Sequence, residues 1–315
     1  MPAIIDGSVA DRSVRAWLAR ADLEMGAAPE EILARVVAAT GQPTCGDGIG
    51  ALRFWGQTGD RPTAWMAAAD PVHLEARLDH LRLQCFWSGE WQEQELQQLF
   101  DELQAALATD GDIGFVRLRS CGYLRSHSPM PTALHSPQLV NGCNPVEFLP
   151  LGSAAARYQA LLSEIQMTLH HSAVNQLREE QDLRAINSLW IWGGGVAAET
   201  SPRELPPLFA DDAVLRGYWL SSASEVLSWP EGLDQCAARA PRGFVAVAPN
   251  QAATAQEYAE TLSEYLRELR RMLRHSEFRG LTLLFRHGLT ARIRPHQVFR
   301  VWRREMPHFQ TSVSE

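Results

Sequence analysis

The chain has 315 residues, of which 45% are hydrophobic and 21% charged, values typical of a folded protein with one large or two modest domains. No apolar stretch approaches the roughly 20 residues that a membrane-spanning helix needs. The N-terminus lacks the basic start and small-residue cleavage site of a secretory signal. Five cysteines without a C-x-x-C pair argue against a disulfide scaffold or a thiolate zinc site. We therefore expect a soluble, cytoplasmic protein that does not act at a membrane.

The basic residues are all arginine, because the 29 Lys and Arg include no lysine. A Walker A phosphate loop and pyridoxal-phosphate catalysis both need a lysine, so both classes are excluded. The net charge of −8 argues against nucleic acid as a partner. The charge is nevertheless unevenly distributed, since the segment from Arg267 to the end contains eleven arginines and four acidic residues. This basic segment could interact with an acidic protein partner or, as we favour, with the acidic remainder of the same chain.

The first part of the chain, residues 1–125, has mixed helical and strand patterns. Apolar spacing predicts helices over residues 14–23, 29–39 and 95–107, and strands over residues 51–55, 63–68, 80–87 and 115–118. We expect an α+β N-terminal half. Five prolines follow between residues 126 and 150, so residues 126–153 are expected to form an irregular connection.

The second part, residues 154–315, alternates helices with short apolar strands. The expected helices cover residues 154–181, 253–274 and 296–304, and the expected strands cover residues 186–192, 244–248 and 281–285. Such alternation is typical of an α/β half whose largely parallel sheet is flanked by helices.

Polar residues form a stripe along the helix expected at residues 154–181. Glu164, Thr168, His171, Asn175 and Arg178 fall on one face at 100° per residue. A solvated helix face is the plain explanation, but Asn and His are mediocre helix formers, which favours a ligand-binding role. The stripe holds only if Ser172 does not break the helix.

Two further patterns are candidate sites. Gly193, Gly194 and Gly195 end an expected strand, where backbone amides could approach an anion, although such glycines more often form a turn. Asp70 and His73 could form a ligand pair or an acid/base pair. The alternative is a turn at Asp70 with His73 bonded to backbone, and spacing alone favours that alternative.

Signals for catalysis are weak in this sequence. The ten histidines are scattered, and neither H-E-x-x-H nor G-x-S-x-G occurs. We therefore predict no metal ligands, no cofactor and no identifiable catalytic residues.

Several motifs together resemble a known bacterial family. They are Ala69-Asp-Pro-Val-His-Leu74, Leu161-Leu-Ser-Glu-Ile-Gln-Met167, Asn175-x-x-Arg178, Ile186-Asn-Ser-Leu-Trp-Ile-Trp-Gly-Gly-Gly195 and Asp211-Asp-Ala-Val-Leu-Arg-Gly217. This combination is similar to the RpfE-type regulatory proteins, which in turn resemble cofactor-independent phosphoglycerate mutases of the alkaline phosphatase superfamily. The resemblance implies a fold of alkaline-phosphatase type in a reduced form. In the mutases, Asp and His hold two manganese or zinc ions, but the C-terminal half of this chain has no Asp-rich metal motif.

These observations favour a non-catalytic regulatory or ligand-binding protein on a degenerate phosphoglycerate-mutase-like scaffold, taking a phosphorylated or carboxylate metabolite. Arg178 would pair with the anion, while Asn175, Asn187 and the Gly193–Gly195 backbone would orient it. His171 with Glu164, and then Asp70 with His73, are the next candidates. The alternatives are an active phosphoglycerate mutase or phosphatase that uses Mn or Zn, and a protein-interaction module using the Arg-rich C-terminal segment.

Overall fold

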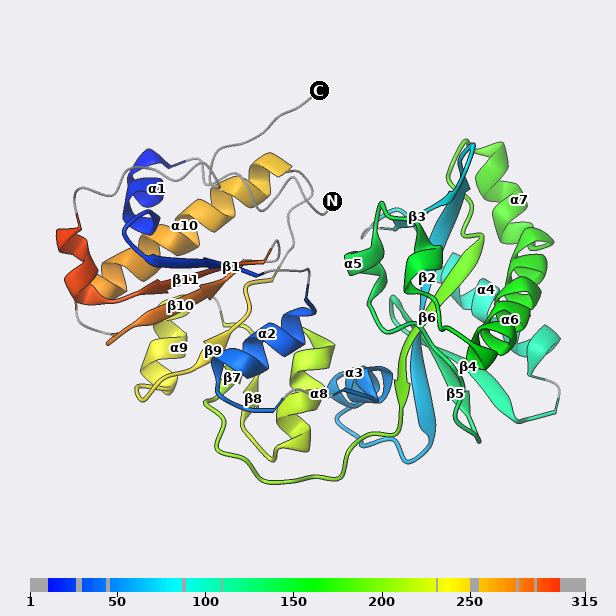
Figure 1. Cartoon of the computed structure of the whole chain (residues 1–315), viewed down its shortest axis with the longest axis horizontal. Coiled ribbons are helices and arrows are strands. Elements are labelled where there is room, and N and C mark those ends of the chain that lie inside the picture. The colour runs from blue at the N-terminus through cyan, green and yellow to red at the C-terminus, as the bar shows by residue number, and fades with distance from the viewer. Residues whose placement is uncertain are drawn as a thin grey trace. The chain divides into compact units, whose positions relative to one another are not determined.

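A computed structural model describes residues 11–26, 30–43, 46–86, 89–108, 110–230, 232–249, 255–275, 278–285 and 288–300. The chain forms two compact units (Figure 1). Unit 1 comprises Met1–Thr44, Arg203–Asp211 and Ser224–Glu315, and unit 2 comprises Cys45–Pro202 and Asp212–Ala223. The boundaries expected at residues 125 and 153 both lie within unit 2.

Unit 1 contains an antiparallel sheet whose strands come from the first and the last parts of the sequence. Its strands are β1 (Asp22–Met25), β10 (Leu281–Leu284) and β11 (Leu289–Ile293), in the order β1-β11-β10. The helices of this unit are α1 (Arg12–Leu18), α2 (Ile32–Ala39), α9 (Leu233–Arg239) and α10 (Ala255–Arg274), with the short η2 (Pro295–Phe299). Leucines of α10 at helical spacing pack in a core with Val14, Trp17 and Leu18 of α1.

A second, small sheet of unit 1 is parallel. It consists of β7 (Leu208–Phe209), β8 (Val226–Leu227) and β9 (Val245–Ala246), in the order β8-β7-β9. Phe209 of β7 packs with Cys236 and Ala240 in a small hydrophobic core. Among the described residues, this sheet is the part that matches the expected parallel arrangement.

Unit 2 is built on an antiparallel sheet around one long strand. Its strands are β2 (Trp65–Ala76), β3 (Leu81–Cys85), β4 (Ile113–Leu118), β5 (Cys121–Ser126) and β6 (Ser188–Gly195). Strand β2 pairs with β6, with β5 at its start and with β3 at its end. Pro71 lies between the stretch paired with β5 and the stretch paired with β3, where the missing N–H of proline is tolerated.

Both faces of this sheet are covered. Successive side chains of a strand point to opposite sides, so the two faces contribute to separate cores. Ala67, Ala69, Leu189 and Ile191 belong to a core with α4 (Glu93–Leu107), α6 (Ser153–His170) and α7 (Ala173–Glu180). The intervening residues, including Trp190 and Trp192, pack in another core with Ile49 of α3 (Ile49–Thr58). Unit 2 also contains α5 (Pro137–Val140), η1 (Pro145–Phe148) and α8 (Ala213–Ser221). Figure 1 shows α4, α6 and α7 together on one side of the strands.

Glycines bring α3 close to its neighbours. A Cβ at Gly50 would lie 2.4 Å from the Ala68 nitrogen, and a Cβ at Gly56 would lie 1.9 Å from the Ala213 oxygen of α8. A Cβ at Gly217 of α8 would in turn lie 1.8 Å from the Leu52 oxygen. Only glycine permits backbones to approach this closely, so these three positions fix how α3 packs on β2 and α8.

Three expectations were wrong. The sheets of the described residues are mostly antiparallel, because an apolar strand buried on both faces looks the same in sequence whether its neighbours run parallel or antiparallel. Residues 51–55 form part of helix α3 and are not a strand. The helix expected over residues 154–181 is two helices, since Ser172 caps α7 by accepting a hydrogen bond from the Val174 amide. None of the helices in the described ranges is long and apolar enough to cross a membrane.

Candidate functional site

A buried ion pair lies at the centre of unit 2. Nη1 of Arg53, on α3, donates to both carboxylate oxygens of Asp70, on β2, at 2.7 and 2.8 Å. Nη2 donates to the Gly122 carbonyl at 2.6 Å, and Trp192 Nε1 donates to Asp70 Oδ2 at 2.7 Å. The Arg53 and Asp70 side chains are only 9% and 12% exposed. Asp70 therefore accepts three hydrogen bonds from Arg53 and Trp192 and is largely buried.

Aromatic rings enclose this pair. The Arg53 guanidinium lies 4.7 Å from the centre of the Tyr123 ring and 5.9 Å from that of Trp192. Burial would by itself lower the pKa of Arg53, but the Asp70 carboxylate reverses this and raises the pKa, so Arg53 stays charged. Burial raises the pKa of the Tyr123 hydroxyl, which donates to Gln57. The cluster therefore combines a charged guanidinium with its carboxylate partner in aromatic surroundings.

Asp70 and His73 do not form a pair with each other. Nδ1 of His73 lies 2.8 Å from the Ala185 carbonyl, on the segment that leads into β6. Three residues along a strand place the two side chains on opposite faces. The structure thus shows His73 bonded to backbone, while Asp70 lies within β2 and not in a turn.

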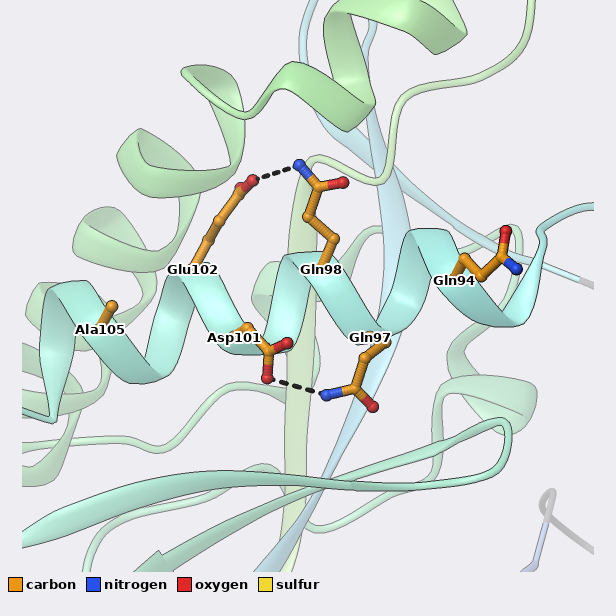
Figure 2. Close-up of a pocket in the computed structure, with 6 residues that line it drawn as sticks. All are labelled: Gln94, Gln97, Gln98, Asp101, Glu102 and Ala105. Atoms are coloured by element: carbon orange, nitrogen blue, oxygen red, sulfur yellow. Dashed lines mark hydrogen bonds between the residues drawn. The ribbon is translucent and has the colours of Figure 1, made fainter.

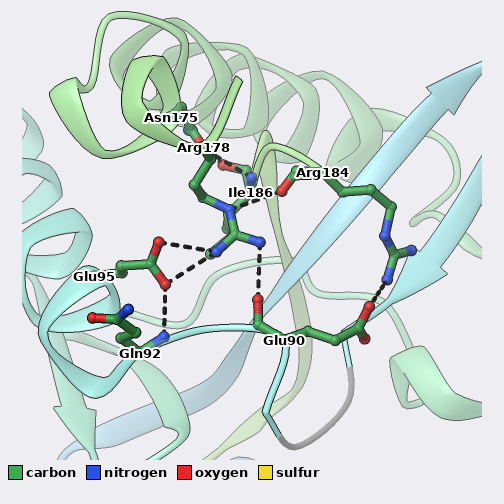
Figure 3. Close-up of polar contacts among 7 residues, drawn as sticks. All are labelled: Glu90, Gln92, Glu95, Asn175, Arg178, Arg184 and Ile186. Atoms are coloured by element: carbon green, nitrogen blue, oxygen red, sulfur yellow. Dashed lines mark hydrogen bonds and ion pairs between the residues drawn. The ribbon is translucent and has the colours of Figure 1, made fainter. Parts of the chain in front are cut away.

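A second polar cluster surrounds Arg178 of α7 (Figure 3). Nη1 donates to both oxygens of the Glu95 carboxylate at 3.0 Å. Nη2 donates to the Glu90 carbonyl at 3.0 Å and Nε to the Arg184 carbonyl at 2.8 Å. The Arg178 side chain is only 2% exposed, against 22% for Glu95. A carboxylate from α4 therefore already occupies the guanidinium expected to hold a ligand.

Arg184 extends this cluster toward β3. It donates to the Glu90 carboxylate at 2.5 Å and to Gln84 Oε1 at 2.7 Å. Its guanidinium lies 4.9 Å from the centre of the Phe86 ring, and that of Arg178 lies 5.5 Å from the same ring. The two arginines thus fix the segment between α7 and β6 against β3 and the N-terminal side of α4.

The two asparagines hold backbone. Asn175 is buried, donates to the Leu169 and Ile186 carbonyls at 2.8 and 2.9 Å, and accepts from the Ile186 amide at 2.8 Å (Figure 3 shows the Ile186 contacts). Asn187 bridges to β2, accepting from the Leu74 amide at 2.7 Å and donating to the Leu74 carbonyl at 3.0 Å. Both side chains satisfy buried or strand-edge backbone groups.

Glu164 and His171 lie apart from this cluster. Both are exposed and belong to α6, with His171 at its C-cap, where Nδ1 lies 2.7 Å from the Met167 carbonyl. Because the helix breaks at Ser172, the polar stripe splits into an exposed part on α6 and a buried part, Asn175 and Arg178, on α7.

The three glycines at the end of β6 serve close packing. The Gly193 amide donates to the Ala133 carbonyl at 3.0 Å, and the Gly194 amide donates to Thr132 Oγ1 at 3.1 Å. A Cβ at Gly194 would lie 2.3 Å from the Trp65 ring, and a Cβ at Gly195 would lie 2.4 Å from the Gly48 nitrogen. Two of the amides are thus already engaged within unit 2, and packing explains the glycines.

A shallow surface depression lies over the exposed side of α4 (Figure 2). One helix provides its whole lining: Gln94, Gln97, Gln98, Asp101, Glu102 and Ala105. Two glutamine–carboxylate pairs, Gln97–Asp101 at 2.8 Å and Gln98–Glu102 at 2.9 Å, run along the helix. Such pairs stabilise a solvated helix face, which is the simplest explanation of this surface.

Sequence reasoning missed the partners of the predicted residues. Arg53 carries the one signal that could have been found, because it stands among apolar and small residues in Ile49-Gly-Ala-Leu-Arg-Phe-Trp-Gly56. A charge in such a setting needs a buried partner. Glu90, Glu95 and Arg184 carry no local signal.

The donor set does not fit the metal centre that the resemblance implies. Within the described ranges, no three His, Cys, Asp or Glu side chains are grouped so that they could hold a metal ion. Asp70, the buried carboxylate of unit 2, is neutralised by Arg53.

Comparison with known proteins gives a weak similarity. No protein-family model matches the chain. It is 26% identical over 145 residues to the 2,3-bisphosphoglycerate-independent phosphoglycerate mutase of Methanosarcina barkeri (strain Fusaro / DSM 804), which covers 44% of this chain and 36% of that protein. The match thus spans about a third of the curated relative.

Two solved structures are also similar. A cofactor-independent phosphoglycerate mutase from Thermoplasma acidophilum DSM 1728 gives a TM-score of 0.44 at 14% identity, over 96% of this chain and 88% of that one. A protein from Pyrococcus horikoshii gives 0.46 at 16% identity, over 84% and 71%. The sequence similarity to a phosphoglycerate mutase supports that part of the expected resemblance, while the RpfE-type assignment stays a prediction.

Proposed function

We propose that this protein is a non-catalytic regulatory or ligand-binding protein on a phosphoglycerate-mutase-like scaffold, and that it takes a phosphorylated or carboxylate metabolite. The similarity to a phosphoglycerate mutase over 145 residues supports the scaffold. The observation that carries the non-catalytic part is the engagement of Asp70, whose oxygens accept three hydrogen bonds from Arg53 and Trp192. A buried carboxylate that is paired with a guanidinium and held by an indole N–H in this way has the contacts of a structural counterion.

The Arg178–Glu95 contact supports a location for the ligand. The Glu95 carboxylate lies against Nη1 of Arg178, with both oxygens at 3.0 Å, and a metabolite carboxylate or phosphate offers the same acceptor atoms. Glu95 is also the more exposed partner. In this proposal the ligand anion takes the place of Glu95 on Arg178, and Asn175 and Asn187 keep the segment between α7 and β6 in position.

Binding and turnover of phosphoglycerate test the two parts of the proposal. Calorimetric titration with 3-phosphoglycerate measures binding, and phosphorus NMR of the same mixture with added manganese measures conversion to 2-phosphoglycerate. We expect binding without conversion. Conversion would establish the active-mutase alternative, and lack of binding by either phosphoglycerate would contradict the ligand assignment.

The Glu95→Gln variant tests the location. Removing the internal carboxylate frees Arg178 for the ligand, so the affinity for 3-phosphoglycerate should rise about tenfold, which corresponds to about 1.4 kcal/mol. Glu102→Gln is the matched control, since Glu102 lies on the same helix and its carboxylate accepts a hydrogen bond from Gln98. Equal affinities of the two variants would place the ligand elsewhere.

A further inference from the structure

Two histidines and a methionine lie together at the C-terminal end of α6, in unit 2. His170 is the last residue of the helix and His171 is its C-cap, and Ser172 then caps α7. Both histidines are exposed, and the centres of their rings lie 5.3 Å apart. Met167 lies three residues before His170 and four before His171, and it is 64% exposed. Residues at these spacings are neighbours on a helix surface, so the thioether and both imidazoles share one exposed region.

A backbone hydrogen bond fixes which nitrogen of His171 is available to a ligand. Nδ1 of its ring lies 2.7 Å from the Met167 carbonyl, and a carbonyl only accepts hydrogen bonds, so Nδ1 carries a proton. The neutral ring then presents the lone pair of Nε2 to solvent. Metal-binding histidines are usually held in this way, with the other ring nitrogen donating to a carbonyl or carboxylate. His171 therefore has the tautomer and the backbone support of a metal ligand.

The separation of the two rings also suits a single ion. Histidine nitrogens bind metals at about 2.0–2.1 Å, which places the centres of two rings on one ion about 5–5.5 Å apart. The 5.3 Å between His170 and His171 matches this separation, and both rings are exposed, so packing holds neither away from a shared ion. The last carbonyl groups of α6 contribute as well, because a helix C-terminus attracts cations.

The donor types indicate which metal fits. We propose that Met167, His170 and His171 bind one copper(I) ion. A thioether is a soft ligand that favours Cu(I), and imidazole is also a good ligand for copper. This site differs from the Asp and His centre of phosphoglycerate mutases because one of its donors is a thioether. It uses none of the residues around Arg178, so it is independent of the proposed metabolite site.

Silver titration of the full-length protein tests this proposal, because Ag(I) is a soft monovalent ion like Cu(I) and needs no reductant. Accessible thiols such as that of the exposed Cys143 are first blocked with N-ethylmaleimide, and nitrate replaces chloride in the buffer. Calorimetry should show tight binding of Ag(I) and much weaker binding of Zn(II). Zn(II) binding as tight as Ag(I), or no binding of Ag(I), would overturn the proposal.

Variants locate the site. Met167→Leu and His170→Gln replace exposed side chains, and each should weaken Ag(I) binding at least about tenfold, since the loss of a group that only orients a ligand already costs about 10–100-fold. Met25→Leu and His127→Gln are the matched controls, because both residues are exposed and lie outside α6. Cu(I) kept reduced with ascorbate should give the same order of affinities in competition with bathocuproine disulfonate. Unchanged Ag(I) affinity of Met167→Leu would overturn the assignment.

Oxidation gives an independent measure of the thioether ligand. Hydrogen peroxide converts exposed methionine to its sulfoxide, and a sulfur atom bound to Ag(I) has a lone pair engaged by the ion. Peptide mass spectrometry should find that one equivalent of Ag(I) slows oxidation of Met167 several-fold and leaves oxidation of Met25 unchanged. Equal oxidation of Met167 with and without Ag(I) would show that its thioether is not a ligand and would contradict the proposal.

Discussion

Removing Arg53 should destabilise unit 2 strongly, because Asp70 would remain buried without its counterion. Arg53→Met keeps most of the aliphatic stem but removes the guanidinium that lies over the Tyr123 and Trp192 rings, together with its three hydrogen bonds to Asp70 and Gly122. Breaking a buried ion pair on one side costs about 3–5 kcal/mol. For a unit of this size that corresponds to a fall of about 6–20 °C in melting temperature.

The assay is urea unfolding followed by tryptophan fluorescence and circular dichroism. Asp70→Asn should cost a similar amount alone, whereas the double variant should be destabilised by at least about 2 kcal/mol less than the sum of the two, because neither charge is then left unpaired. Arg77→Met is the matched control. Its ion pair with Glu75 is 46% and 29% exposed and should contribute at most about 1 kcal/mol. Strict additivity of the Arg53 and Asp70 variants would refute the reasoning.

Three other perturbations follow from the packing. Gly56→Ala should cost about 2 kcal/mol or more in urea unfolding, because its Cβ would meet α8, while Gly46→Ala, with open space around it, should be nearly neutral. Asn175→Ala should cost at least about 2 kcal/mol, since three buried backbone contacts lose their partner; a smaller loss would show that water replaces the amide. Burial raises the pKa of Cys85 from 9.0 to about 12. The unfolded state therefore ionises first, so stability should fall as pH rises from 9.0 toward about 12, and Cys85→Ala should reduce that fall. At pH 8, mass spectrometry should find the exposed Cys143 alkylated before Cys85.

Local pattern was sufficient for the elements with long, regular periodicity. The amphipathic repeats at residues 95–107 and 253–274 correspond to α4 and α10, and the alternation at residues 80–87 corresponds to β3. Short apolar segments have too few residues for periodicity to distinguish a helix from a strand. Most of residues 51–55 are buried because α3 is enclosed by β2 and α8. Enclosure removes the periodicity that separates a buried helix from a strand.

The sequence alone determined that the chain folds around amphipathic helices, that lysine chemistry is excluded, and that Asp70, Asn175 and Arg178 are unusual in their settings. Only the tertiary structure decided what these residues contact. Arg53 and Glu95 are 17 and 83 residues away from the charges they neutralise, at Asp70 and Arg178. Ion pairs form between side chains that meet in space, and strand direction depends on which segments pair. Neither property is encoded in local periodicity, so the partners and the antiparallel sheet emerged only from the fold.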